Sequence, residues 1–148
     1  LIDSEAEGLA VAGALAKVQV AERALHMPAS AFSGGNQQKV VMAKWLLAGG
    51  RVLLLFDPTR GVDVGTKHEI YLLINEYVRA GGSVILYSTE IEEVVHLSHR
   101  VVVFYGGSIV REIDGAVEAI SESEIMRAAL GSTQTHGPDS AARKAVQS

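Results

Sequence analysis

The sequence predicts an α/β fold with a mostly parallel sheet, accompanying helices and a C-terminal antiparallel hairpin. Two continuous apolar runs, residues 52–56 and 83–87, have the pattern of parallel strands that are buried on both faces. Between them, residues 70–78 carry apolar side chains at helical spacing. A later pair of strand-like runs flanks Gly106-Gly107, which predicts a hairpin.

The first part of the chain is expected to be helical. Residues 6–17 are rich in alanine and leucine, which favours a helix. In residues 18–31, Pro28 interrupts the pattern, so we expect a short helix or a turn there. Residues 34–47 form the next predicted helix, because a glycine pair follows at once and is a common helix stop. Trp45 on this helix is expected to pack in the core.

The central segment is expected to be a loop at residues 58–65 followed by a helix. Thr66-Lys67-His68-Glu69 has the spacing of a capping box at the helix start. The apolar stripe behind it consists of Ile70, Leu73, Ile74, Tyr77 and Val78. This helix is expected to end at Gly81-Gly82, and residues 91–97 are expected to form a short helix in which Glu92 and Glu93 face solvent.

The last part begins with the predicted hairpin strands, residues 100–105 and 108–113. Ser121-Glu122-Ser123-Glu124 is a second capping box, and it opens a helix expected to stop at Leu130-Gly131. Residues 132–148 are polar and contain Gly137-Pro138, which predicts a disordered tail.

Composition excludes several classes of function. The 148 residues carry a formal net charge of −4, which argues against a general nucleic-acid binder. There is no cysteine, so disulfides and thiolate metal sites are excluded, and the histidines do not have metal-ligand spacing. No apolar run is long enough to cross a bilayer. The chain begins at Leu1 in helical sequence without a methionine, from which we expect a piece of a longer protein.

The most informative motif is Ser33-Gly34-Gly35, which opens the helix of residues 34–47. A serine hydroxyl, two glycine amides and a helix N-terminus together favour an anion site. An apolar run that ends in Asp57-Pro58-Thr59 follows this helix. Glycine loop, helix, buried strand and acid, in that order, indicate a protein that works on nucleotide phosphates.

These motifs resemble those of the C-terminal half of an ABC transporter nucleotide-binding domain. Residues 32–36, Phe-Ser-Gly-Gly-Asn, are similar to the signature motif Leu-Ser-Gly-Gly-Gln. Residues 37–39 and 43–46 resemble the second ATPase domain of tandem carbohydrate-import ATPases of the ribose and xylose type. Residues 60–65, Arg-Gly-Val-Asp-Val-Gly, resemble the D-loop of that subgroup. The resemblance covers roughly residues 6–131 and several ordered motifs.

The resemblance implies that residues 1–131 are the C-terminal part of an ATP-binding domain of the P-loop NTPase class, with signature helix, Walker B strand, D-loop and switch region. In this family the signature closes on ATP that the opposite domain carries. The implied cofactor-binding residues are Ser33, Gly34, Gly35, Asn36 and Gln37 of the signature and Asp63 of the D-loop.

The Walker B segment departs from the family pattern of apolar residues followed by Asp-Glu-Pro-Thr. Aligned without a gap on Pro58-Thr59, the chain has Phe56 at the Mg²⁺-associated aspartate and Asp57 at the catalytic glutamate. A phenyl ring cannot hold a metal-bound water, and Asp57 is one methylene too short for an ideal base. A one-residue gap would instead make Asp57 the metal aspartate and delete the base. The gap-free alignment is favoured because it keeps the spacing to Asp63 regular.

The switch position and the phosphate loop also differ. Glu90 stands where the family has a histidine that contacts the γ-phosphate, and a carboxylate there would repel a triphosphate. No Gly-x-x-x-x-Gly-Lys-Ser/Thr occurs in the chain. The site on this chain's own strands is therefore expected to be degenerate, without a metal site, and Asp57 is only a weak catalytic candidate.

The first functional hypothesis is a fragment of the ATP-binding subunit of a carbohydrate importer. It implies ATP and Mg²⁺ in the intact assembly, and as partners a second ATP-binding domain and membrane permease subunits, without nucleic acid. It also implies a peripheral position on the cytoplasmic face of the cell membrane. Two alternatives remain: a non-catalytic pairing module or truncated remnant, and an ABC-family ATPase outside transport. In each case the isolated chain is expected to be inactive.

Overall fold

The computed structural model describes residues 4–20 and 27–131. The chain divides into two compact units, Leu1–Leu97 and Ser98–Ser148, each of which is described by itself. The predicted disordered tail, residues 132–148, lies outside the described residues.

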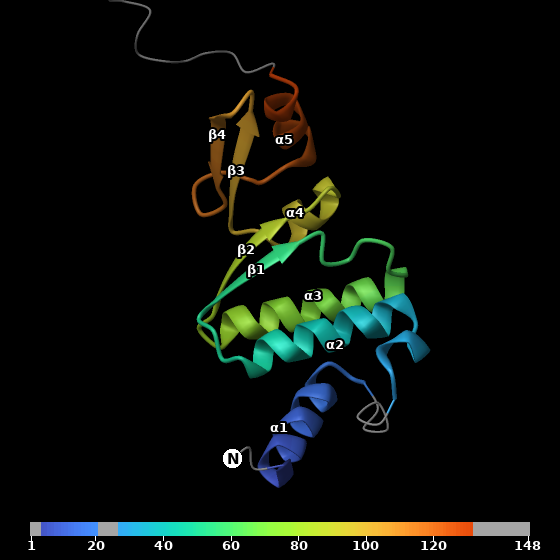
Figure 1. The fold of residues 1–148 in the computed structure, drawn as a ribbon. Helices are drawn as coiled ribbons and strands as arrows, with labels where there is room; N and C mark the ends of the chain where they lie inside the picture. Colours follow the sequence, from blue (N-terminus) through green and yellow to red (C-terminus); the bar gives the residue numbers. More distant parts are fainter. Residues whose placement is uncertain (1–3, 21–26, 132–148) are drawn as a thin grey trace, which may run out of the picture. The chain divides into compact units, whose positions relative to one another are not determined.

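The first unit combines helices with a two-stranded sheet (Figure 1). Its described elements are α1 (Ser4–Lys17), the 3₁₀ helix η2 (Ala29–Ala31), α2 (Gly34–Leu47), β1 (Val52–Phe56), α3 (Val64–Arg79), β2 (Ser83–Tyr87) and α4 (Ile91–Leu97). The glycines that follow α2 and α3, Gly49 and Gly81, have φ of 66° and 91°. This left-handed conformation is open to glycine at little cost, so both helices end where the glycine pairs predict.

The two strands pair in parallel, in register from Val52 with Ser83 to Phe56 with Tyr87. Leu53 and Leu55 are buried against Met42 of α2 and against α3. Figure 1 shows α2 and α3 side by side, with both strands on the same side of the pair. The helix order, the parallel pairing and the α/β class are therefore as predicted.

The prediction that both strands are buried on both faces is wrong. We call the side chains that point away from α2 and α3 the outer face of the sheet. They are 52 to 74% exposed and comprise Val52, Leu54, Phe56, Ile85 and Tyr87. The apolar sequence of each strand is suited to burial on both faces, but within the described residues α2 and α3 pack against only one face of the sheet.

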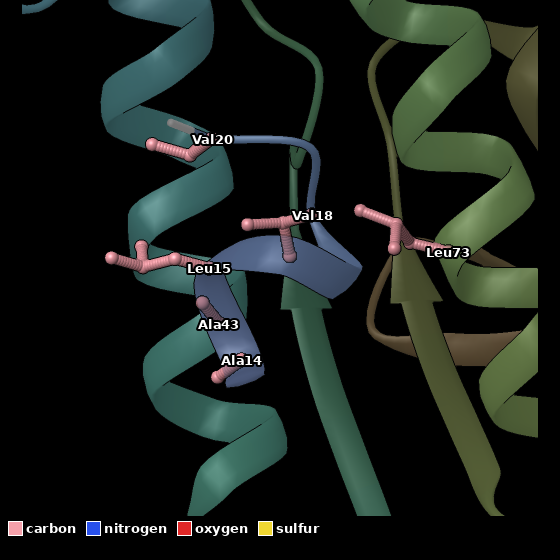
Figure 2. Close-up of a cluster of buried hydrophobic side chains, with 6 residues drawn as sticks. All are labelled: Ala14, Leu15, Val18, Val20, Ala43 and Leu73. Atoms are coloured by element: carbon pink, nitrogen blue, oxygen red, sulfur yellow. The ribbon is translucent and has the colours of Figure 1, made fainter. Parts of the chain in front are cut away.

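A second apolar cluster joins the end of α1 to the helices behind it. Its buried members are Ala14, Leu15, Val18, Val20, Ala43 and Leu73. Figure 2 shows Val18 between α2 and Leu73 of α3, and Ala14 and Leu15 beside Ala43. These contacts attach α1 to the helix pair that carries the glycine motif at one end.

The start of α3 differs from the prediction. The helix begins at Val64, and its N-cap is Asp63, whose side chain accepts a hydrogen bond from the Thr66 amide. Thr66 therefore lies in the first turn and is not the cap of a box with Glu69. Glu69 forms an ion pair with the buried Lys39 of α2 and is not available to cap the helix.

The second unit contains the predicted hairpin and a helix. β3 (Arg100–Tyr105) and β4 (Ser108–Asp114) are antiparallel, with a register shift after Val103. α5 (Glu122–Ala129) has Ser121 as its N-cap, accepting from the Glu124 amide, which confirms half of the predicted capping box. The Glu124 carboxylate instead pairs with Arg111 of β4, together with Glu118.

Candidate functional site

The N-terminus of α2 has the geometry of an anion site. Ser33 is its N-cap, and the Ser33 Oγ accepts from the Asn36 amide at 3.4 Å. The amides of Gly34 and Gly35 lie in the first turn of α2, and the carbonyls four residues before them are outside the helix, so the helix itself leaves these amides without a partner. A Cβ added at Gly34 would meet nothing within 4 Å, and Ser33 and Gly34 are exposed. A phosphate could therefore approach Ser33 and the Gly34 amide without a steric barrier from the described residues.

The remaining signature residues have different surroundings. Gln37 donates from Nε2 to the Phe32 carbonyl at 3.0 Å, which holds the chain ahead of the cap. Gly35 is buried, and a Cβ added there would be 2.8 Å from Thr66 Cγ2. The absence of a side chain at residue 35 thus permits the close approach between α2 and α3. The sequence did not indicate Thr66 as a site residue, because nothing in its local pattern relates it to residue 35.

Asp63 fixes the position of Thr66, the residue that Gly35 approaches. Its Oδ1 accepts from the Thr66 amide at 3.0 Å and its Oδ2 from the Thr66 hydroxyl at 2.8 Å. The hydrogen bond from the Thr66 amide is the main reason why the pKa of Asp63 is lowered. The structure therefore brings Gly35 of the signature and Asp63 of the predicted D-loop together through Thr66.

Asp57 lies at the end of β1 in a left-handed backbone conformation, with φ of 45°. Its Oδ1 accepts from the Thr89 amide at 2.6 Å and from the Thr89 hydroxyl at 3.0 Å. The carboxylate of Asp57, which the sequence suggested as a weak candidate for the catalytic base, thus binds the start of the segment after β2. An acid with one oxygen used in this way is less available for proton transfer.

Phe56 does not fit a metal site. Its ring stacks on Tyr87, with centroids 4.4 Å apart and an angle of 11° between the planes. Both rings belong to the outer face of the sheet, and neither supplies a hard oxygen ligand for Mg²⁺. In the described part of the chain, no group of three or more histidine and acidic side chains could hold a metal ion.

Glu90 has a cationic partner that the sequence did not indicate. It forms an ion pair with Lys67 of α3, and the hydrogen bond between them is the main reason why the pKa of Lys67 is raised. The negative charge at the switch position is therefore partly compensated. Asp57 and Glu90 lie on neighbouring segments, since Thr89, which binds Asp57, directly precedes Glu90.

Two expectations about side-chain exposure are wrong. Glu93 is 1% exposed, and its Oε1 accepts from the buried Thr59 hydroxyl at 2.9 Å. Glu92 alone of the two acids is exposed, because successive residues of α4 point to different sides of the helix. Trp45 is 54% exposed, and its ring lies under the Lys44 ammonium at 5.5 Å.

None of the described helices is both long and apolar enough to cross a membrane. No family model matches the chain.

Curated proteins with similar sequences are ribose import ATP-binding proteins. That of Rhizobium johnstonii is 46% identical over 136 residues, which are 92% of this chain and 26% of the relative. Those of Hahella chejuensis and Streptomyces avermitilis are each 45% identical, over 88% and 94% of this chain. The chain spans about a quarter of the length of these relatives.

Solved structures with the same fold are ATP-binding cassettes of ABC transporters. The dimeric bacterial cassette MJ0796 is 23% identical with a TM-score of 0.68, and the match covers 78% of this chain and 50% of that one. The protein cbiO1 from Clostridium perfringens, part of an ABC transporter complex, is 26% identical with a TM-score of 0.65, over 86% of this chain and 50% of that one. The described units therefore have the fold of about half a cassette.

Proposed function

Because the chain is a homologue of part of the ribose import ATP-binding proteins and has the ABC ATPase fold, we propose that it supplies the signature and D-loop of a carbohydrate importer's ATP-binding subunit. The observation that carries the proposal is the start of α2. There the exposed Ser33 and Gly34 present a hydroxyl and amide donors that no intrahelical acceptor uses.

In this proposal, residues 1–131 complete an ATP site whose phosphate loop belongs to a partner domain. Ser33 and the amides of Gly34 and Gly35 bind the γ-phosphate, with Asn36 and Gln37 shaping the entrance. Asp63 holds the D-loop beside them by capping α3. The positive end of the α2 dipole adds to the attraction for phosphate.

The site on the chain's own strands is proposed to be degenerate. Phe56 gives Mg²⁺ no ligand, Asp57 is engaged by Thr89, and Glu90 places an acid at the switch position. ATP and Mg²⁺ would therefore be held in the intact assembly, with Mg²⁺ supplying charge neutralisation on the partner domain. The chain alone is expected to bind no ATP at millimolar nucleotide and to catalyse no hydrolysis.

The partners are proposed to be a second ATP-binding domain and membrane permease subunits, without nucleic acid. This places the assembled protein on the cytoplasmic face of the cell membrane, as a peripheral subunit. The relatives are ribose import ATP-binding proteins, which supports a carbohydrate cargo. A second candidate is a pairing module without ATPase activity, which Phe56 favours because it removes one acid of the hydrolytic pair.

The experiment is a chimera in which residues 1–131 replace the matching segment of the Rhizobium johnstonii relative. Ser33→Asp places a second anion beside the γ-phosphate and is expected to lower the ATPase rate by at least about tenfold, because juxtaposed like charges cost several kcal/mol. Aspartate is itself a good N-cap, so the helix is preserved.

Ser121→Asp is the matched control, because Ser121 caps α5 with the same 3.4 Å contact to the amide three residues on. This control should leave the ATPase rate unchanged. Equal rates for the two variants in an active chimera would contradict the signature role. A chimera that dimerises on ATP without hydrolysing it would favour the pairing module.

A further inference from the structure

Glu93 is a buried acid to which the proposed function assigns no role. It is 1% exposed, its Oε1 accepts from Thr59, and its Oε2 has no hydrogen-bond partner among the described residues. Burying a carboxylate costs free energy unless both oxygens are compensated. Glu92, the preceding residue, is exposed. Of these two adjacent acids only Glu93 bears the free-energy cost of burial, which suggests that its carboxylate positions a neighbouring segment.

The groups around Glu93 come from three elements. Thr59 lies in the loop between Asp57 and Asp63, and it is as fully buried as Glu93. The negative charge of Glu93 acts on two residues of α3, Lys67 and Tyr71, and contributes to the raised pKa of each. For Tyr71, burial is the larger cause and this charge the second. Glu93 therefore lies where the loop after β1, helix α3 and helix α4 meet.

Two separate attachments join the loop after β1 to the segment after β2. Asp57 accepts from Thr89, and Glu93 accepts from Thr59. The hydrogen bonds at Asp57 hold the loop at one point and would leave it free to turn there. The bond from Thr59 to Glu93 adds a second point, two residues further along the loop and four residues further along the other segment, and so fixes the orientation of the loop. The switch residue Glu90 lies between the two attachments.

We propose that Glu93 is a positioning residue that, through Thr59, fixes the loop leading to Asp63 against the segment that carries Glu90. A displacement at the switch position then moves the D-loop and the start of α3 with it. The inference rests on the proposed function for the meaning of those segments, but the mechanical connection exists without ATP.

The test uses the full chain and apolar isosteres, chosen so that the double variant leaves no carboxylate buried without a donor. Thr59→Val removes the hydroxyl and Glu93→Met removes the acceptor at similar volume. Replacing both partners of a buried hydrogen bond by apolar groups can leave stability almost unchanged. The double variant is therefore expected to fold, with wild-type helical circular dichroism.

Amide hydrogen exchange is then measured separately for residues 60–63 and 88–90. We expect the double variant to exchange about five- to tenfold faster in both segments, the factor that one such hydrogen bond is worth. Either single variant should produce most of this change. Glu92→Met, the matched control on the exposed neighbour, should produce none.

Faster exchange in only one of the two segments would overturn the proposal, and so would unchanged exchange in both. If the double variant fails to fold, Thr59→Ser, which retains a hydroxyl, is compared with Thr59→Val. Wild-type exchange in the serine variant and fast exchange in both segments of the valine variant support the connection, and any other pattern contradicts it.

A second arm uses the chimera with Thr59→Val and Glu93→Met. Misplacement of the D-loop by about 1 Å is expected to lower kcat by up to about a hundredfold with the KM for ATP unchanged. If the unsubstituted chimera is inactive, the proposed function fails while the exchange result still decides the role of Glu93.

Discussion

Gly35 lies so close to Thr66 that a Cβ added to the glycine would be 2.8 Å from Thr66 Cγ2 and 3.0 Å from its hydroxyl. The same hydroxyl donates to Asp63. The first turn of α2 and the first turn of α3 are therefore in direct contact, although residues 35 and 66 belong to two motifs that the sequence presents as separate.

This contact predicts opposite effects for the two neighbouring glycines. Gly35→Ala should lower the free energy of unfolding by about 1–3 kcal/mol, because the Thr66 side chain must move. Gly34→Ala meets open space and should raise that free energy by up to about 1 kcal/mol, as alanine does within a helix. Urea unfolding of the full chain measures both. Thr66→Ser, which removes Cγ2, should restore part of the loss at Gly35, and its failure to do so would place the clash elsewhere.

The Asp63 cap predicts a pH dependence. Its pKa is lowered below the ordinary value of 3.8, chiefly by the Thr66 amide, so folding favours the charged form. The stabilisation is present above the unfolded pKa and is lost as the pH falls through the folded pKa. The stability difference between the wild type and Asp63→Asn should therefore shrink in acid, because asparagine keeps an acceptor that does not titrate. Parallel unfolding curves from about pH 6 to about pH 2 measure it. A difference that does not change with pH would contradict the assignment.

Asp57 is expected to matter for folding through its acceptor and its backbone conformation. Asp57→Asn keeps Oδ1 for Thr89 and tolerates the positive φ, so its stability should be within about 1 kcal/mol of the wild type. Asp57→Ala loses both and should cost about 1–3 kcal/mol. Asp57→Glu, which restores the family's acid, should also destabilise because its longer side chain misplaces the acceptor. A glutamate variant more stable than the asparagine variant would refute this ranking.

The outer face of the sheet predicts self-association of the isolated chain. Leu54 is 72% exposed in a row of apolar side chains, so Leu54→Lys should reduce association without unfolding the chain. Leu55, its buried neighbour at 9% exposure, is the matched control, and Leu55→Lys should unfold the chain by burying a charge. Light scattering and circular dichroism distinguish the two effects. Equal light scattering from the Leu54 variant and the wild type would exclude this face as the cause of association.

Elements with local signals were predictable to the residue. α2, β1, β2 and α4 have the predicted bounds. A glycine pair follows α2 and α3, and apolar runs mark both strands. The exposure of one face of the sheet was not predictable, because an apolar strand sequence shows only that both of its faces are suited to burial against other elements. The cover itself depends on which other segments are present.

The start of α3 shows a different limit. Asp63 and Thr66 are three residues apart, as are Thr66 and Glu69, so two cap assignments fit the same stretch of sequence. In the structure Asp63 is the N-cap, and Glu69 forms an ion pair with Lys39 of α2, a contact that the local sequence does not show.

The candidate site was predictable in its motifs and less so in its contacts. Ser33 as an N-cap follows from local pattern alone. The burial of Glu93 depends on Thr59, 34 residues earlier, and no spacing rule relates the two. Lys67 opposite Glu90 was missed for the same reason, since the two residues are 23 apart.

The left-handed backbone at Asp57 also bears on how this position evolves. Aspartate and asparagine tolerate that conformation better than most residues, and the side chain is already needed to hold Thr89. Selection for folding alone would therefore keep one of these two residues here after any selection for hydrolysis had ended. An acid retained at this position in descendants of the chain would be evidence of a preserved fold and would say nothing about a preserved active site.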